Sequence, residues 1–163
     1  MKSLTRSIYL LFLIAFSAQI LVASPRERAE IDEKYKWKLT DIYSDWSAWE
    51  QDLVKLEGLM DEYAKLKGSL SGGPKNLLKA FTMREELSLI SDRVSTYAGL
   101  VRALDNRDNE VYSKLQQVQI LFSKFGTATS WFAPELLQIP WTTMDKWFNE
   151  NTELAPYRFG ISD

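Results

Sequence analysis

Acidic side chains come closest to forming a chemical site in this sequence. Two pairs are adjacent, Asp61 with Glu62 and Glu85 with Glu86. A shared proton or metal ion needs carboxylates that converge, whereas neighbouring positions of a helix point about 100° apart. We therefore interpret both pairs as parts of solvated helix faces.

An oxygen-rich turn is formed by Asp105, Asn106, Asp108 and Asn109. Such a turn could face calcium, but the calcium loop of an EF-hand needs a D-x-D-x-D-G spacing and a terminal glutamate, and both are missing here. We expect these residues to cap helices.

The stretch from Ser71 to Lys75 reads S-G-G-P-K and brings glycines and a lysine to a predicted helix start. Anions bind at such places, but a phosphate loop needs a longer glycine-spaced backbone and a lysine followed by serine or threonine. The stretch therefore predicts a turn, with Pro74 at the first helical position. We assign no catalytic, cofactor-binding or metal-binding residue.

Composition narrows the function further. The 163 residues include no histidine and no cysteine. Zinc sites and most acid-base or nucleophilic catalysis use these side chains, so we expect no cofactor in this chain and no activity of its own. The formal charge is -2 and no run of basic residues occurs, which argues against nucleic acid as a partner.

The first 23 residues have the pattern of a secretory signal peptide. Lys2 and Arg6 precede an uncharged stretch, residues 7–23, that ends in small residues. We predict cleavage after Ala23; the alternatives are a retained membrane anchor at 7–23 and a buried helix. The remaining chain is expected to be extracytoplasmic, secreted or periplasmic.

Three apolar stripes predict three long helices. Their members recur every three or four residues, as one face of a helix does. They are Trp46, Trp49, Leu53, Leu56, Met60, Tyr63 and Leu66; then Leu87, Ile90, Val94, Tyr97, Val101 and Leu104, with Leu77, Leu78 and Phe81 upstream; then Val111, Leu115, Val118, Phe122, Phe125, Thr129 and Phe132.

The predicted helix ends follow from local signals. Ser47 and Glu50 form a capping box, Gly68 ends the first helix, and Pro134 stops the third. A shorter helix is predicted from Thr142 to Asn149, begun by a Thr142 to Asp145 cap.

The predicted fold is all-α, an antiparallel bundle of three long helices plus a short C-terminal helix, preceded by an N-terminal signal helix. We expect a densely charged segment at 24–43 and one helical domain at 44–163.

Large rings crowd the stretch from Tyr35 to Leu53, which holds three tryptophans and two tyrosines. One explanation is that Trp37, Trp46 and Trp49 pack this segment over the bundle, because each ring buries a large area. The other is that some of these rings form half of an interface, since a small bundle covers few rings by itself.

Three motifs in this order resemble a known family: Y-K-W-K-L-T-D-I-Y from Tyr35, F-G-T-A-T-S-W-F-A-P-E-L-L from Phe125, and N-T-E-L-A-P-Y-R-F from Asn151. They are similar to the N-terminal region of oligoendopeptidase F, a thimet-oligopeptidase-like zinc metallopeptidase. The resemblance covers about Tyr35 to Phe159.

The resemblance implies a zinc enzyme whose H-E-x-x-H helix lies in a C-terminal catalytic region. No catalytic residue carries over, because these 163 residues contain no such motif. The expected function is a non-catalytic module, a fragment or split half, that would wall an oligopeptide channel.

The expected partner is a catalytic peptidase half, or a second copy of the chain, and oligopeptides would bind only with that half present. The alternative is an independent extracytoplasmic helical binding or adaptor protein.

Overall fold

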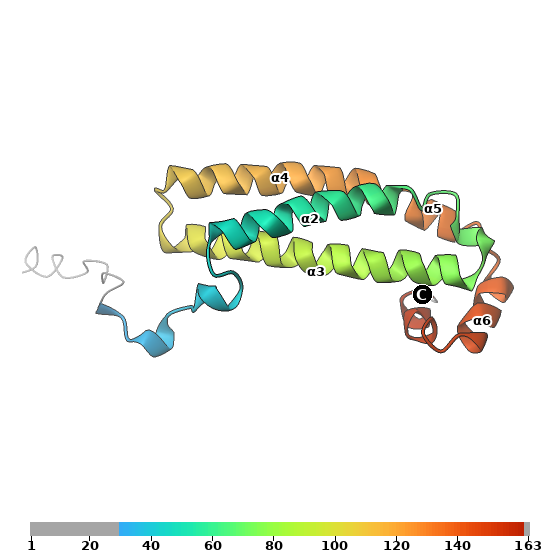
Figure 1. The fold of residues 1–163 in the computed structure, drawn as a ribbon. Helices are drawn as coiled ribbons and strands as arrows, with labels where there is room; N and C mark the ends of the chain where they lie inside the picture. The colour runs from blue at the N-terminus through green and yellow to red at the C-terminus, as the bar shows by residue number, and fades with distance from the viewer. Residues whose placement is uncertain (1–29, 162–163) are drawn as a thin grey trace, which may run out of the picture. The chain divides into compact units, whose positions relative to one another are not determined.

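The computed structural model describes residues 30–161, and the elements in this part of the chain are all helical (Figure 1). The described residues fall into two compact units, 30–38 and 39–161. The first contains one short 3₁₀ helix, η3 (Glu33–Tyr35), whose start is capped by the Asp32 carboxylate accepting from the Lys34 backbone N–H. The predicted signal peptide or anchor, residues 1–23, lies outside the described residues.

Three long helices dominate the second unit: α2 (Trp46–Ala64), α3 (Pro74–Leu104) and α4 (Asn109–Thr129). In Figure 1, α2 and α4 run from left to right and α3 runs back between their ends, so that neighbours along the chain are antiparallel. Each packs against the other two. The predicted three-helix antiparallel bundle is therefore observed.

Shorter elements complete this unit. The 3₁₀ helices η4 (Leu39–Asp41) and η5 (Leu70–Gly72) precede α2 and α3, and α5 (Phe132–Leu136), α6 (Trp141–Glu150) and the 3₁₀ helix η6 (Ala155–Gly160) follow α4. One short C-terminal helix is predicted from the sequence, and that prediction does not include every short element. It missed α5 and η6, which are too short to show a helical period.

The core contains most members of the predicted stripes. Trp49, Leu56, Leu77, Leu87 and Val94 are fully buried. Phe122 is an exception, because it is 45% exposed while Leu121 beside it is buried. Leu121 and Phe122 point about 100° apart around α4, and Leu121 is the one of the two that faces the core.

The start of α2 corrects the predicted capping box. The cap is Asp45, whose carboxylate accepts from the Ala48 backbone N–H at 2.9 Å, so Ser47 lies inside the helix. A carboxylate at this place also interacts favourably with the helix dipole. Glu50 instead forms an ion pair with Lys114 of α4.

The end of α2 is only partly as predicted. Gly68 does adopt a left-handed conformation, with φ of 84°, but the helix ends earlier at Ala64. The turn between them is held by Glu135 of α5, whose two carboxylate oxygens each accept a backbone N–H at 2.7 Å, from Gly68 and from Leu70.

Two further predicted ends are wrong. The third helix ends at Thr129, and Pro134 lies in the first turn of α5, where its missing N–H has no helical partner to lose. The α6 helix begins at Trp141 after Pro140, whose ring has no atom that could cap it, so Thr142 lies inside the helix; Asp145 pairs with Arg158 instead.

The ring-rich stretch follows the packing explanation for three of its members. Tyr43 and Trp49 are buried, and the half-buried Trp46 contacts Trp49 edge-on at 5.2 Å between ring centroids. Trp37 is 54% exposed and Tyr35 74% exposed. Among the described helices, none is both long and apolar enough to cross a bilayer.

Candidate functional site

The adjacent carboxylates diverge, as the sequence predicted. Glu85 accepts a hydrogen bond from the Tyr157 hydroxyl at 2.8 Å, whereas Glu86 pairs with Lys55 of α2 at 2.7 Å. Glu62 pairs with Lys65 one turn away. These pairs stabilise exposed faces and do not converge on a common ligand.

The oxygen-rich turn caps two helices. Asp105 accepts from the Arg107 backbone and guanidinium, and the hydrogen bonds from Arg107 lower the pKa of Asp105. Asp108 accepts from the Glu110 and Val111 backbone N–H groups at the start of α4. Within residues 30–161 no cluster of three or more acidic side chains is arranged to hold a metal ion.

The glycine-rich stretch forms a turn. Gly72 donates its N–H to the Ser69 carbonyl at 3.0 Å, and Gly73 has a φ of 132° that favours glycine. Pro74 is the first residue of α3, as predicted.

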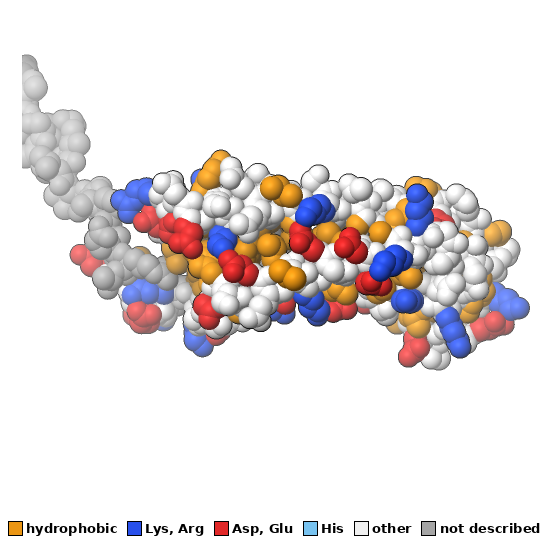
Figure 2. Space-filling model, turned by 45° about the horizontal axis from the view of Figure 1, so that its top comes forward, with side chains coloured by type: hydrophobic (Ala, Val, Ile, Leu, Met, Phe, Trp, Pro, Cys, Tyr) orange, Lys and Arg blue, Asp and Glu red, His pale blue; other side chains and the backbone are white. Residues whose placement is uncertain are grey.

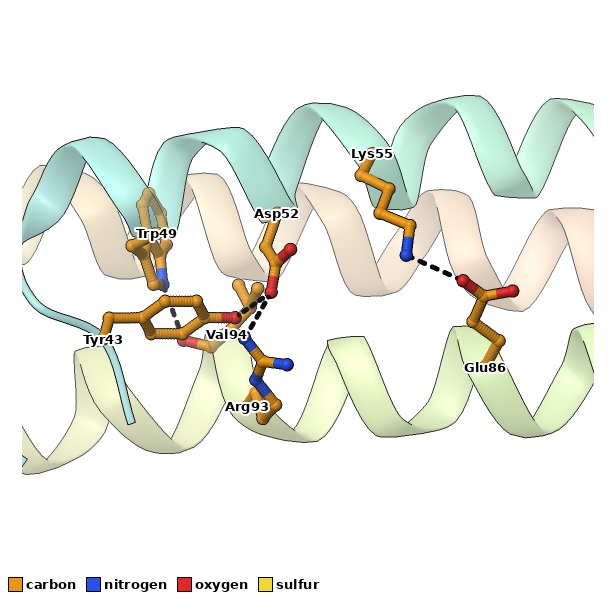
Figure 3. Close-up of polar contacts among 7 residues, drawn as sticks. All are labelled: Tyr43, Trp49, Asp52, Lys55, Glu86, Arg93 and Val94. Atoms are coloured by element: carbon orange, nitrogen blue, oxygen red, sulfur yellow. Dashed lines mark hydrogen bonds and ion pairs between the residues drawn. The ribbon is translucent and has the colours of Figure 1, made fainter. Parts of the chain in front are cut away.

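A polar cluster joins the start of α2 to α3 (Figure 3). The Tyr43 hydroxyl donates to Asp52 at 2.7 Å, and Arg93 pairs with the same carboxylate oxygen at 2.8 Å. Arg93 also lies over the Tyr43 ring, 4.9 Å from its centroid. Burial, followed by the Asp52 hydrogen bond, raises the pKa of Tyr43, so this hydroxyl stays neutral and acts as a structural donor.

The Trp49 indole N–H beside this cluster donates to the Val94 carbonyl of α3 at 2.8 Å (Figure 3). Further ion pairs join the helices, Glu50 with Lys114 and Glu57 with Lys124. Figure 2 shows side chains of both signs alternating along this face, with apolar side chains between them. The polar contacts therefore fix the helices against one another.

The candidate site is an open groove of about 670 Å³ between α3, α5 and η6, which we call the α3–η6 groove. Its rings come from distant parts of the sequence. Phe81 stacks on Tyr157 with 4.4 Å between ring centroids and 7° between planes, and Phe132 meets Phe81 edge-on at 5.4 Å. The groove is lined by Phe81, Arg84, Glu85, Ser88, Leu89, Phe132, Ala133, Leu136, Tyr157, Gly160 and Ile161.

The polar edge of the α3–η6 groove has one acid and one base. Glu85 holds the Tyr157 hydroxyl, and burial together with this carboxylate raises the pKa of Tyr157. Arg84 lies over the Phe132 ring, 5.0 Å from its centroid. The α3–η6 groove therefore combines an apolar floor with two charged groups at its edge, as ligand-binding grooves do.

The sequence does not predict this groove. Phe81 and Phe132 were predicted as core positions, and Tyr157 was noticed only as part of a motif. Phe81 and Tyr157 lie far apart in the sequence, so no local pattern pairs them.

The comparisons with known proteins agree with one another. No family model matches the sequence. Over 134 residues the chain is 28% identical to Group B oligopeptidase PepB of Streptococcus agalactiae, and over 138 residues it is 26% identical to Oligopeptidase PepF of Bacillus subtilis. These alignments cover 80% and 84% of this chain but 22% and 20% of the relatives.

Solved structures give the same result. Oligoendopeptidase-F from Enterococcus faecium matches with a TM-score of 0.65 and 26% identity, over 72% of this chain and 23% of that one. A putative peptidase from Chlamydophila abortus shares the fold with the same TM-score of 0.65 at 24% identity.

In sequence and in fold the chain is similar to one part of larger proteins, the oligopeptidases. More particularly, the chain is a homologue of oligoendopeptidase F, which confirms the resemblance that the three motifs predicted. It spans about a fifth of the length of the curated relatives it matches, 20% to 22%.

Proposed function

We propose that this chain is a non-catalytic helical module of an oligoendopeptidase F-like zinc metallopeptidase and that its helices wall an oligopeptide channel. The observation that carries the proposal is the unequal coverage of the alignments. More than four fifths of the chain matches PepF, but only 20% of PepF is matched.

The side-chain chemistry supports a role in shape and contact. An H-E-x-x-H zinc helix needs two histidines, and these 163 residues contain none. The strongest polar cluster, Tyr43 with Asp52 and Arg93, joins two parts of the bundle and leaves no free acid or base. Metal and water activation would then come from another part of the peptidase.

The wall of a channel has to be rigid, and the packing of the helical bundle provides rigidity. Three helices share one core, and ion pairs join α2 to both of its neighbours, Lys55 with Glu86 and Glu57 with Lys124. Exposed pairs contribute little individually, about 0 to 1 kcal/mol each, so the buried rings supply most of the rigidity.

The purified chain tests the catalytic part of this proposal. We expect no bound zinc by elemental analysis after dialysis, and no cleavage of short fluorogenic peptides with or without added zinc. Bacillus subtilis PepF, assayed in parallel, shows that the conditions support cleavage. Stoichiometric zinc or zinc-dependent turnover by this chain alone would overturn the proposal.

Export is a further part of the proposal, and it rests on the sequence of the first 23 residues. Lys2, Arg6 and the uncharged stretch 7–23 predict translocation. Cell fractionation and N-terminal sequencing test it. We expect an extracytoplasmic protein that begins at Ser24, and a cytoplasmic protein that retains Met1 would contradict export.

A further inference from the structure

We propose that the α3–η6 groove docks the peptidase part, meaning the portion of an oligoendopeptidase F-like protein outside the region that this chain matches. The occupant is an apolar segment of that part, carrying a carboxylate that faces Arg84. This inference rests on the proposed function and names the surface through which the module joins its partner.

The floor of the groove is built for an apolar side chain. The Phe81 and Tyr157 rings are parallel within 7° and stack at 4.4 Å, which leaves a flat double layer beside Phe132. The stack joins η6 to α3 from positions far apart in the sequence. Burying a flat aromatic surface of this kind against a second apolar surface removes water from it and stabilises the complex.

The edge of the groove selects the charge of the occupant. Arg84 contacts the Phe132 ring, and no carboxylate of the described residues lies within ion-pair distance of its guanidinium. The neighbouring acid, Glu85, already accepts the Tyr157 hydroxyl. A guanidinium without a carboxylate partner, held over a ring, complements a carboxylate on the occupant.

Two large apolar side chains at or next to the rim of the groove are exposed to water, and a bound partner would bury them. Leu89 lines the groove and is 66% exposed. Phe159, between the lining residues Tyr157 and Gly160, is 83% exposed. Contacts between domains of one protein typically bury about 600 to 1,500 Å², enough to cover the groove and this rim.

The peptidase part fits this surface better than a second copy of the chain does. In a two-fold dimer the same patch meets itself, so Arg84 would need a carboxylate from the α3–η6 groove. The acid there is Glu85, one of whose oxygens is held by the Tyr157 hydroxyl at 2.8 Å, so a self-pairing would have to be made by its other oxygen alone. By contrast, the region matched in the Enterococcus faecium structure is 23% of a single chain, so its counterpart there is covalently joined to a much larger remainder.

Cysteine labelling tests the proposal, because the chain has no cysteine of its own. Ser88→Cys places a thiol in the groove, and Ser113→Cys places a matched thiol on the exposed surface of α4. Each variant is made in the full chain, and again in a fusion in which residues 35–163 replace the matched region of Bacillus subtilis PepF. The rate of maleimide labelling at each site is read by mass spectrometry, and peptide cleavage by the fusion is measured separately.

We expect both thiols to react alike in the full chain alone. In the fusion, Ser88→Cys should react at least about tenfold more slowly, while Ser113→Cys keeps its rate. Equal reactivity of the two thiols in a fusion that cleaves peptides would overturn the docking surface and leave the proposed function standing. Equal reactivity in an inactive fusion would overturn both. Protection without cleavage would support docking and count against the channel-wall function.

A concentration-dependent protection of Ser88→Cys in the chain alone would identify a second copy as the occupant and overturn the proposal. Charge reversal tests the predicted carboxylate. Arg84→Glu should remove the protection in the fusion, whereas Arg102→Glu should not, although Arg102 also lies over a ring, that of Tyr112 at 5.3 Å. Unchanged protection in Arg84→Glu would refute the carboxylate, and circular dichroism confirms that each variant is folded.

Discussion

At the scale of single residues, two buried tyrosines differ in whether their hydroxyl group has a hydrogen-bond partner. The Tyr43 hydroxyl donates to Asp52, whereas the Tyr63 hydroxyl is buried with no hydrogen-bond partner among the described residues. The Tyr63 ring itself is fully buried and packs on Trp131 at 5.1 Å between centroids. Replacing either tyrosine by phenylalanine keeps the buried ring, so any change in stability reports on the hydroxyl group.

Replacing each tyrosine by phenylalanine should change stability in opposite directions. Tyr63→Phe removes an unsatisfied polar group and should raise the free energy of unfolding by about 1 kcal/mol. Tyr43→Phe removes a hydrogen bond to a charged acceptor and should lower it by about 1.5 to 3 kcal/mol. Urea unfolding at pH 7 measures both, and a loss of stability in Tyr63→Phe would show that its hydroxyl has a partner after all.

The same hydroxyl predicts a loss of stability in alkaline solution. Burial raises the pKa of Tyr63 to about 12 from the ordinary 10.0, so the folded state favours the neutral phenol. Above pH 10 Tyr63 ionises in the unfolded chain but not yet in the folded one. The free energy of unfolding is therefore unaffected below pH 10 and falls as the pH rises toward 12, by about 2 kcal/mol at pH 12. Unfolding at pH 9 and pH 11.5 measures the loss, and Tyr63→Phe should lose less than the natural chain. An equal loss in both would contradict this source.

At the scale of elements, Glu135 is the side chain that ties the end of α2 to α5. Its two oxygens accept the Gly68 and Leu70 backbone N–H groups, each at 2.7 Å, across more than sixty residues of sequence. Gly68 is left-handed, so this turn is defined by backbone conformation and by these two bonds together.

Substituting Glu135 should therefore loosen the turn. Glu135→Gln leaves one amide oxygen where two charged oxygens accepted, and should lower the free energy of unfolding by about 1.5 to 3 kcal/mol. Glu150→Gln is the matched control, since its pair with Lys146 is exposed and 3.9 Å long. Thermal unfolding measures the loss of stability in each variant. An equal loss in the two would mean that the hydrogen bonds of Glu135 do not stabilise the turn.

The long helices could be predicted from the sequence, but only some of their ends could. A stripe such as Trp49, Leu56 and Tyr63 repeats many times, so one misplaced residue such as Phe122 does not hide it. An end depends on a single residue, and Asp45 and Ser47 both have side chains suited to cap a helix. The structure selects Asp45, whose carboxylate reaches the Ala48 N–H.

At the scale of the whole molecule, the site was harder to predict than the fold. The α3–η6 groove needs Phe81, Phe132 and Tyr157 together, and their contacts depend on how α5 and η6 fold back on α3. The spacing of apolar residues along the chain does not predict that α5 and η6 pack against α3. The motif around Tyr157 did suggest oligoendopeptidase F, to which more than four fifths of the chain is similar.

The most direct measurement is the rate at which a short fluorogenic peptide is cleaved by the peptidase part of Bacillus subtilis PepF, with and without residues 35–163 of this chain in place of the matched region. We expect no cleavage by this chain alone and a rate at least about tenfold higher when the two are joined. Equal rates with and without the chain, or cleavage by the chain alone, would contradict its role as a non-catalytic module.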